Sequence, residues 1–124
     1  MAEIIYKEES YEIISVCFKV YNKLGKGLVE AVYKDALELE FRKRNIPFER
    51  EKSFDIYFEE TKLNRKYPAD FVVYDKIILE VKATKDIIGK YIKQTLNYLS
   101  ASKFRLGIIA NFGCDSLIYK RLIN

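Results

Sequence analysis

Two acidic residues and a lysine in the middle of the chain have the types and spacing needed for chemistry on a phosphate ester. Glu80 and Lys82 end an apolar run that begins near residue 76, and Asp70 lies ten residues before Glu80. Because strand side chains alternate between two faces, Glu80 and Lys82 point the same way. Carboxylate oxygens suit a hard divalent cation, and a lysine can steady an attacking hydroxide or the charge of a transition state. The pattern therefore favours a metal-dependent nuclease.

A glutamate and a lysine two positions apart also occur by chance in any charged protein. Such a pair is most often a solvated strand face, and exposed ion pairs contribute little to stability. Taken alone, Glu80 and Lys82 would be interpreted as an ordinary ion pair. The nuclease hypothesis depends on other residues converging on the same place.

Composition limits both the size of the protein and its chemistry. The chain has 124 residues and 49% hydrophobic content, which fits a single domain, residues 1–124, with a real core. No apolar stretch is long enough for a membrane span or a secretion signal, so we expect a cytoplasmic protein with no membrane partner. The chain has no histidine, which excludes serine-histidine and cysteine-histidine hydrolase mechanisms. The two cysteines, far apart in sequence, also exclude zinc sites of the usual spacing.

The net charge of +4 is compatible with a polyanionic partner but does not prove one. The distribution of charge is more informative than its sum. Lys85, Lys90 and Lys93 follow the candidate site, and acidic residues become rare after Asp86. This asymmetry predicts a side of the molecule that faces phosphate groups.

Hydrophobic periodicity and turn residues predict an order of helices and strands. A tight turn at residues 75–76 predicts a hairpin, which would bring Asp70 and Glu80 opposite each other on neighbouring strands. Ser10 is the expected N-cap of the first helix. Helices are expected at residues 10–24, 28–44 and 86–102, and strands at residues 48–58, 63–67, 71–74, 77–81, 105–111 and 117–123.

Three polar residues of the expected helices are further candidates for the site: Glu30, Gln94 and Tyr98. Glu30 falls inside the apolar arc of the second helix, as does Glu40, so each faces inward and either finds a basic partner or binds a ligand. Gln94 and Tyr98 are four apart and share one face at the edge of the third helix. Their alternative interpretation is a solvated amide beside a half-buried phenol.

The order Gly27-x-x-Glu30, Asp70, Glu80-x-Lys82 and Gln94-x-x-x-Tyr98 resembles the PD-(D/E)xK nuclease superfamily in its RecB-like arrangement. Residues 27–33, with 68–70, 79–83, 94–99 and 111–113, resemble more closely the small GxxExxY family of bacterial and archaeal proteins, in which Gly27 and Tyr33 are structural motif residues. The resemblance implies an α/β (α+β) fold with a restriction-endonuclease-like αβββαβ core. In that core a central mixed β-sheet is flanked by helices.

The same resemblance implies roles for individual residues. Asp70 and Glu80 would bind Mg²⁺ or Mn²⁺, with Glu30 as a further ligand, directly or through water. Lys82 would position the nucleophile, and Gln94 would complete the catalytic group. Gln94 and Tyr98 would orient the site and contact the nucleic-acid strand, and the charge asymmetry adds Lys85, Lys90 and Lys93 to that contact. Where members often carry a histidine and a proline, this chain has Tyr21 and Lys26, so no role of that histidine is carried over.

Three classes of function stay open from the sequence. The first is hydrolysis of DNA, with RNA as the less favoured substrate. The second is a weak or inactive nuclease-fold module that binds nucleic acid or assembles with proteins. The third is an interaction domain that uses its 15% aromatic content at an oligomer interface. For a chain of this length we expect no separate recognition domain. Either it recognises simple features such as ends, branches or single strands, or a homo-oligomer or a protein partner supplies specificity.

Overall fold

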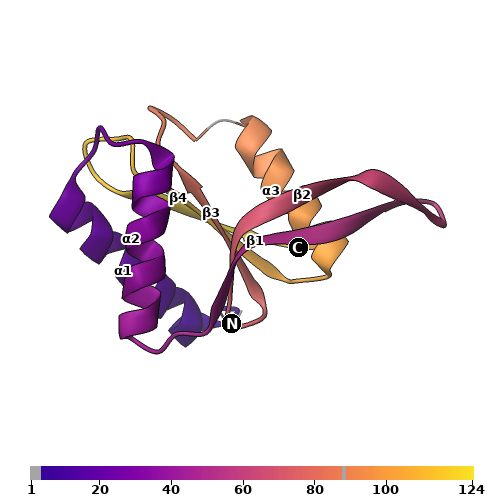
Figure 1. Ribbon diagram of the computed structural model, residues 1–124, viewed down its shortest axis with the longest axis horizontal. Coiled ribbons are helices and arrows are strands. Elements are labelled where there is room, and N and C mark those ends of the chain that lie inside the picture. The colour runs from indigo at the N-terminus through magenta and orange to yellow at the C-terminus, as the bar shows by residue number, and fades with distance from the viewer. Residues whose placement is uncertain (1–3, 88) are drawn as a thin grey trace.

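The protein folds around one five-stranded sheet with helices on both faces (Figure 1). The computed structural model describes residues 4–87 and 89–124. Its elements in chain order are α1 (Lys7–Leu24), α2 (Glu30–Lys43), β1 (Phe48–Phe58), β2 (Thr61–Val73), β3 (Ile77–Lys82), α3 (Gly89–Ser102), β4 (Leu106–Asn111) and β5 (Ile118–Ile123).

The strands lie in the order β1-β2-β3-β4-β5, so each strand pairs with its neighbours in the sequence. β3 and β4 are parallel and the other pairs are antiparallel, which makes the sheet mixed. The parallel pair requires a crossover, and α3 supplies it. This arrangement confirms the predicted α/β class, with a helix, three strands, a helix and a strand in the expected order.

Alternation along the strands divides the core into two layers. Leu79 and Val81 of β3 pack against α1 and α2, whereas Ile78 packs on the other face with residues of α3. The helical pair and α3 accordingly cover opposite faces of the sheet (Figure 1). Because Glu80 and Lys82 share the alternation of Ile78, they point to the face that α3 covers.

The first helix starts earlier than the sequence predicted. Ser10 is not its N-cap, because α1 begins at Lys7 after Tyr6, whose backbone is left-handed with φ 51°. The Ser10 amide already donates a helical hydrogen bond to the Tyr6 carbonyl, and its side chain is buried. Acidic residues that follow Lys7 favour a helix start there because they complement the helix dipole.

The second strand is continuous through Pro68, although the sequence predicted two strands with a break there. Pro68 pairs with Ser53 of β1, and on its other side β3 pairs with β2 only at residues 71–73. A residue without an amide hydrogen is tolerated where one side of the strand has no partner. The hairpin formed by β1 and β2 therefore extends as an arm beyond the body of the molecule (Figure 1).

The remaining elements match their predicted positions within a few residues. α2 begins at Glu30 rather than at residue 28, and α3 is described from Gly89 rather than from residue 86. Residue 88, which the predicted helix included, lies outside the described residues. None of the helices in the described ranges is long and apolar enough to cross a membrane.

Candidate active site

The ladder between β2 and β3 opens where Asp70 and Glu80 face each other. Backbone pairing stops at Phe71 and Leu79, one residue short of the two acids. Their carboxylates take the place of ladder partners. Asp70 Oδ2 accepts a hydrogen bond of 2.7 Å from the Val81 amide, and Glu80 Oε2 accepts one of 3.3 Å from the Asp70 amide. The structure thus brings these two predicted site residues together.

Glu80 is buried and only partly satisfied. The residue is 3% exposed, and its Oε1 atom has no hydrogen-bond partner among the described residues. Burial raises the pKa of Glu80 well above its ordinary value, and the negative charge of Asp70 raises it further. Buried polar atoms are nearly always paired, so an unpartnered carboxylate oxygen beside a second carboxylate fits a cation ligand.

Lys34 of α2 also reaches this site, and the sequence reasoning missed it. Its Nζ lies 2.9 Å from Asp70 Oδ1 and 2.5 Å from Glu51 Oε1, and its side chain is 12% exposed. Burial alone would lower the pKa of Lys34, but the hydrogen bonds to the two carboxylates outweigh it and the pKa is raised. One signal was present in the sequence, because Lys34 lies four residues after Glu30 on the same helical face.

Glu30 lies near the two acids without joining them. Burial raises the pKa of Glu30, and the charge of Asp70 adds to this effect. Within residues 4–87 and 89–124, however, no three acidic or cysteine side chains gather closely enough to hold a metal ion. The other inward glutamate of the helix, Glu40, pairs with Lys19 and Arg44, as the alternative interpretation predicted.

Lys82 extends from β3 over α3. Its Nζ lies 4.6 Å from the centre of the Tyr91 ring, which is a cation–π contact. Burial raises the pKa of Glu80 most, and the positive charge of Lys82 partly opposes that rise. Lys82 is therefore held beside the acids at the same end of the sheet.

One face of α3 borders a hollow of about 350 Å³ next to the acids. Tyr98 is buried, and burial followed by the charges of Glu80 and Asp70 raises its pKa. The lining residues are Tyr67, Lys90, Lys93, Gln94, Asn97 and Tyr98. Four of the predicted residues thus share one surface.

Lys85 does not line this hollow. It is exposed in the segment between β3 and α3, where its carbonyl oxygen accepts a hydrogen bond of 2.9 Å from the Cys114 thiol. The predicted cluster of basic residues is therefore divided between the hollow and this segment.

Gly27 and Tyr33 shape the turn that leads into Glu30. Gly27 has φ 100°, a conformation that favours glycine. The Tyr33 hydroxyl donates to the Gly25 carbonyl at 2.5 Å and accepts from the Leu28 amide at 3.3 Å. Its ring stacks on Phe112, which follows β4, with ring centres 4.6 Å apart. These contacts fix the start of α2 against the end of the sheet.

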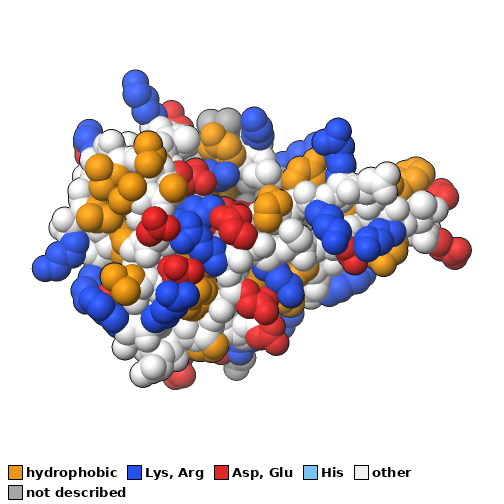
Figure 2. Space-filling model, in the orientation of Figure 1, with side chains coloured by type: hydrophobic (Ala, Val, Ile, Leu, Met, Phe, Trp, Pro, Cys, Tyr) orange, Lys and Arg blue, Asp and Glu red, His pale blue; other side chains and the backbone are white. Residues whose placement is uncertain are grey.

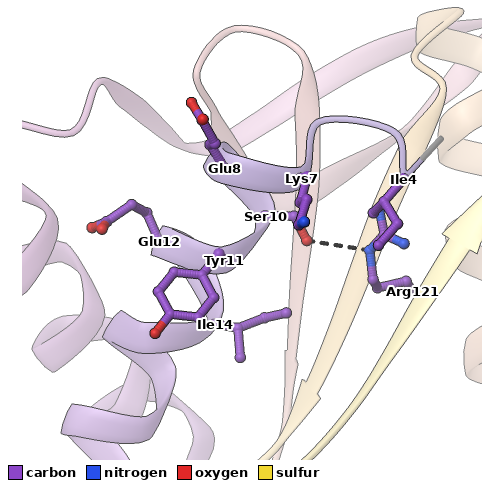
Figure 3. A pocket seen from close by; sticks show the side chains of 8 residues that line it. All are labelled: Ile4, Lys7, Glu8, Ser10, Tyr11, Glu12, Ile14 and Arg121. Atoms are coloured by element: carbon purple, nitrogen blue, oxygen red, sulfur yellow. Dashed lines mark hydrogen bonds between the residues drawn. The ribbon is translucent and has the colours of Figure 1, made fainter.

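The surface has two further features, a region of mixed charge and a larger hollow. Figure 2 shows acidic side chains beside lysines and arginines between α2 and the base of the β1–β2 arm. A larger hollow of about 680 Å³ borders the first half of α1, where Ser10 Oγ accepts a hydrogen bond from Arg121 (Figure 3). It includes none of the predicted site residues.

Comparison with known proteins identifies the family. A model described as the PD-(D/E)XK nuclease superfamily matches residues 7–122. The chain belongs to this superfamily. A search of curated proteins finds no match.

Solved structures agree with the superfamily at the level of the fold. The crystal structure of SSO0001 matches with a TM-score of 0.57 and 17% identity, over 96% of this chain and 57% of that one. An alkaline exonuclease, LHK-Exo, from Laribacter hongkongensis matches with a TM-score of 0.54 and 14% identity, over 100% of this chain and 72% of that one. The chain thus spans a little over half the length of SSO0001.

The sequence pattern after which the PD-(D/E)XK superfamily is named coincides with the acidic pair of the structure. Glu80-Val81-Lys82 has the form of its second half, and Asp70 is the acid that pairs with Glu80 in the structure. One residue, Ala69, separates Pro68 from Asp70. Pattern and geometry therefore point to the same end of the sheet.

Proposed function

We propose that this protein is a metal-dependent nuclease that hydrolyses phosphodiester bonds of DNA, with RNA as the less favoured substrate. The observation that carries the proposal is the pair formed by Asp70 and Glu80, in which one buried carboxylate oxygen has no partner among the described residues. Membership of the PD-(D/E)XK superfamily supports it, because that superfamily is one of nucleases.

Asp70 and Glu80 are the residues that would hold Mg²⁺ or Mn²⁺, and Glu30 would bind it directly or through water. When bound, the cation would polarise a phosphoryl oxygen and lower the pKa of a water molecule. Lys82 would hold the nucleophile or the charged phosphate, since its ammonium is near enough to Glu80 for its charge to lower the pKa of that carboxyl. The charge of Asp70 raises the pKa of both Glu80 and Glu30, and a dication would relieve this repulsion.

The hollow on α3 is the proposed contact surface for nucleic acid. Tyr98 and Gln94 line it next to the acids, and Lys90 and Lys93 add positive charge at its border. Lys85 would contact the strand from the neighbouring segment. The chain would belong to the RecB-like group and the GxxExxY family, and in the RecB-like pattern Gln94 and Tyr98 orient the site and contact the nucleic-acid strand. A second copy or a protein partner would supply the specificity that so small a surface lacks.

Cleavage assays test the proposal directly. We expect Glu80→Gln, Asp70→Asn and Lys82→Ala each to lower Mn²⁺-dependent cleavage of labelled DNA about a thousandfold, because each removes several kcal/mol of transition-state stabilisation. Linear, circular and single-stranded DNA, and RNA, would be compared with and without Mn²⁺.

Glu9→Gln is the matched control for these variants, since Glu9 pairs with Lys76 in a different part of the molecule. It should retain wild-type cleavage. If purified Glu80→Gln protein with a normal melting curve cuts DNA as fast as wild type, the proposed function is wrong.

A second function is favoured by one observation. The Lys34 ammonium already neutralises Asp70, and no three metal-binding side chains gather among the described residues. A catalytically weak or inactive module for nucleic-acid binding or protein assembly would have this form. Its marker would be salt-dependent DNA binding without any metal-dependent product.

A further inference from the structure

Lys34 connects two acids on neighbouring strands. Glu51 lies between the residues of β1 that pair with Phe71 and Ala69, so it stands across from Asp70. Its backbone has φ 57°, and its side chain is 46% exposed. The Lys34 ammonium contacts the Asp70 carboxylate on its buried side and the Glu51 carboxylate on its open side.

The position of this ammonium conflicts with a metal ion. Asp70 has two carboxylate oxygens, and both are engaged: Oδ2 by the Val81 amide and Oδ1 by Lys34. Each oxygen keeps a second lone pair, so a divalent ion that binds Asp70 would either share an oxygen with one of these donors or displace that donor. The Lys34 ammonium would also repel the metal ion, because only the Asp70 carboxylate would separate the two positive charges.

We propose that Lys34 is an internal cation that competes with divalent metal for the Asp70 carboxylate and is displaced from it when metal binds. This inference rests on the proposed function, because it assumes that Asp70 is a metal ligand. Glu51 keeps the displaced lysine paired, so the ammonium is not left buried without a partner. In the metal-free protein the Lys34 ammonium neutralises the Asp70 carboxylate, and in the metal-bound protein the metal ion neutralises it.

Metal affinity tests this competition. Calorimetric titration with Mn²⁺ should show about tenfold tighter binding to Lys34→Gln than to wild type, since one competing charge is gone. Lys34→Arg keeps the charge and should bind Mn²⁺ no more tightly than wild type. Lys76→Gln is the control for net charge, because Lys76 is also ion-paired but with Glu9, and it should bind like wild type.

A double variant isolates the shared carboxylate. In an Asp70→Asn background, the Lys34→Gln change should no longer tighten Mn²⁺ binding, because the carboxylate charge for which the two cations compete is absent. Equal affinities of wild type and Lys34→Gln would overturn the inference while leaving the proposed metal site intact. If neither protein binds Mn²⁺, the metal site and this inference both fail.

A measurement on the wild-type protein does not depend on the folding of any variant. An amine-reactive reagent followed by peptide mass spectrometry should label Lys34 severalfold faster in saturating Mg²⁺ than in EDTA, because displacement exposes the ammonium. The labelling rate of Lys76 should not change. An unchanged rate at Lys34 in a protein that binds Mg²⁺ would contradict displacement.

Discussion

The backbone ladder between β2 and β3 ends one residue before Asp70 and Glu80, and the two carboxylates take the place of the missing ladder partners. Each carboxylate accepts a main-chain amide hydrogen bond. Both residues are buried, so a negative charge on either one lies in a low-dielectric region. Burial and the charge of Asp70 both raise the pKa of Glu80. Without metal, ionisation of Glu80 therefore opposes folding.

This opposition predicts how stability depends on pH. A raised folded-state pKa means that the folded protein binds the proton more tightly than the unfolded chain, so the stabilisation is complete at low pH. It is lost as the pH rises above about 4.5, the ordinary value for glutamate, toward the raised pKa. Glu80→Gln cannot ionise, and we expect it to be about 2 kcal/mol more stable than wild type at pH 8 in EDTA.

Urea unfolding at pH 5, pH 6.5 and pH 8 measures this difference. The gap between Glu80→Gln and wild type should widen with pH, because only wild type carries a group at this position that folding forces to keep its proton. A gap that stays constant over this range would show that folding does not raise the pKa of Glu80.

At the scale of elements, the segments that follow β3 and β4 are packed tightly against each other beside the acids. Asn111 Oδ1 accepts hydrogen bonds from the Thr84 amide at 3.1 Å and from the Gly113 amide at 3.0 Å. A Cβ atom added at Gly113 would lie 2.5 Å from the Thr84 amide nitrogen. Real Cβ atoms are not found this close to backbone, so one segment would have to move.

Gly113→Ala should therefore destabilise the fold by about 2 kcal/mol, the usual effect of overpacking against a backbone that cannot yield. Gly89→Ala is the matched control, because a Cβ there meets no atom within 4 Å and alanine favours the helix that begins at this residue. Thermal unfolding of the two variants would measure the contrast. Equal melting temperatures would mean that the two segments are not in fixed contact.

Sequence patterns predicted most of the helices and strands, because hydrophobic periodicity follows directly from which side chains are buried. The alternation that places Glu80 and Lys82 on one face is local. The turn spans residues 74–76 rather than the predicted 75–76, and this extra residue sets Asp70 opposite Glu80. The predicted break at Pro68 was wrong because whether a strand tolerates proline depends on which neighbour it has. That neighbour is set by the tertiary fold rather than by the residue itself.

Lys34 and Glu51 were missed for a similar reason. Each looks like an ordinary surface residue in its own element, and the contact exists only because α2 packs across the start of the β1–β2 arm. The same limit applies to Lys85, whose position depends on how the segment after β3 packs against Cys114.

At the scale of the whole molecule, the acids lie where two layers of the structure meet. α2 contributes Glu30 and Lys34 from one face of the sheet, and α3 contributes Tyr98 from the other. The strands between them carry Asp70 and Glu80. A cation bound at this point would connect both layers, so its effect should extend to global stability.

Divalent metal should therefore raise the melting temperature of the entire chain. A ligand that binds only the folded state stabilises it by about 2.7 kcal/mol at a hundred times its dissociation constant. For a chain of this size that is equivalent to a rise of about 10 °C. Differential scanning calorimetry in EDTA and then in excess Mn²⁺ would measure the rise, and the Asp70→Asn, Glu80→Gln double variant should show almost none. If wild type melts at the same temperature in both solutions, the acids do not bind a metal ion.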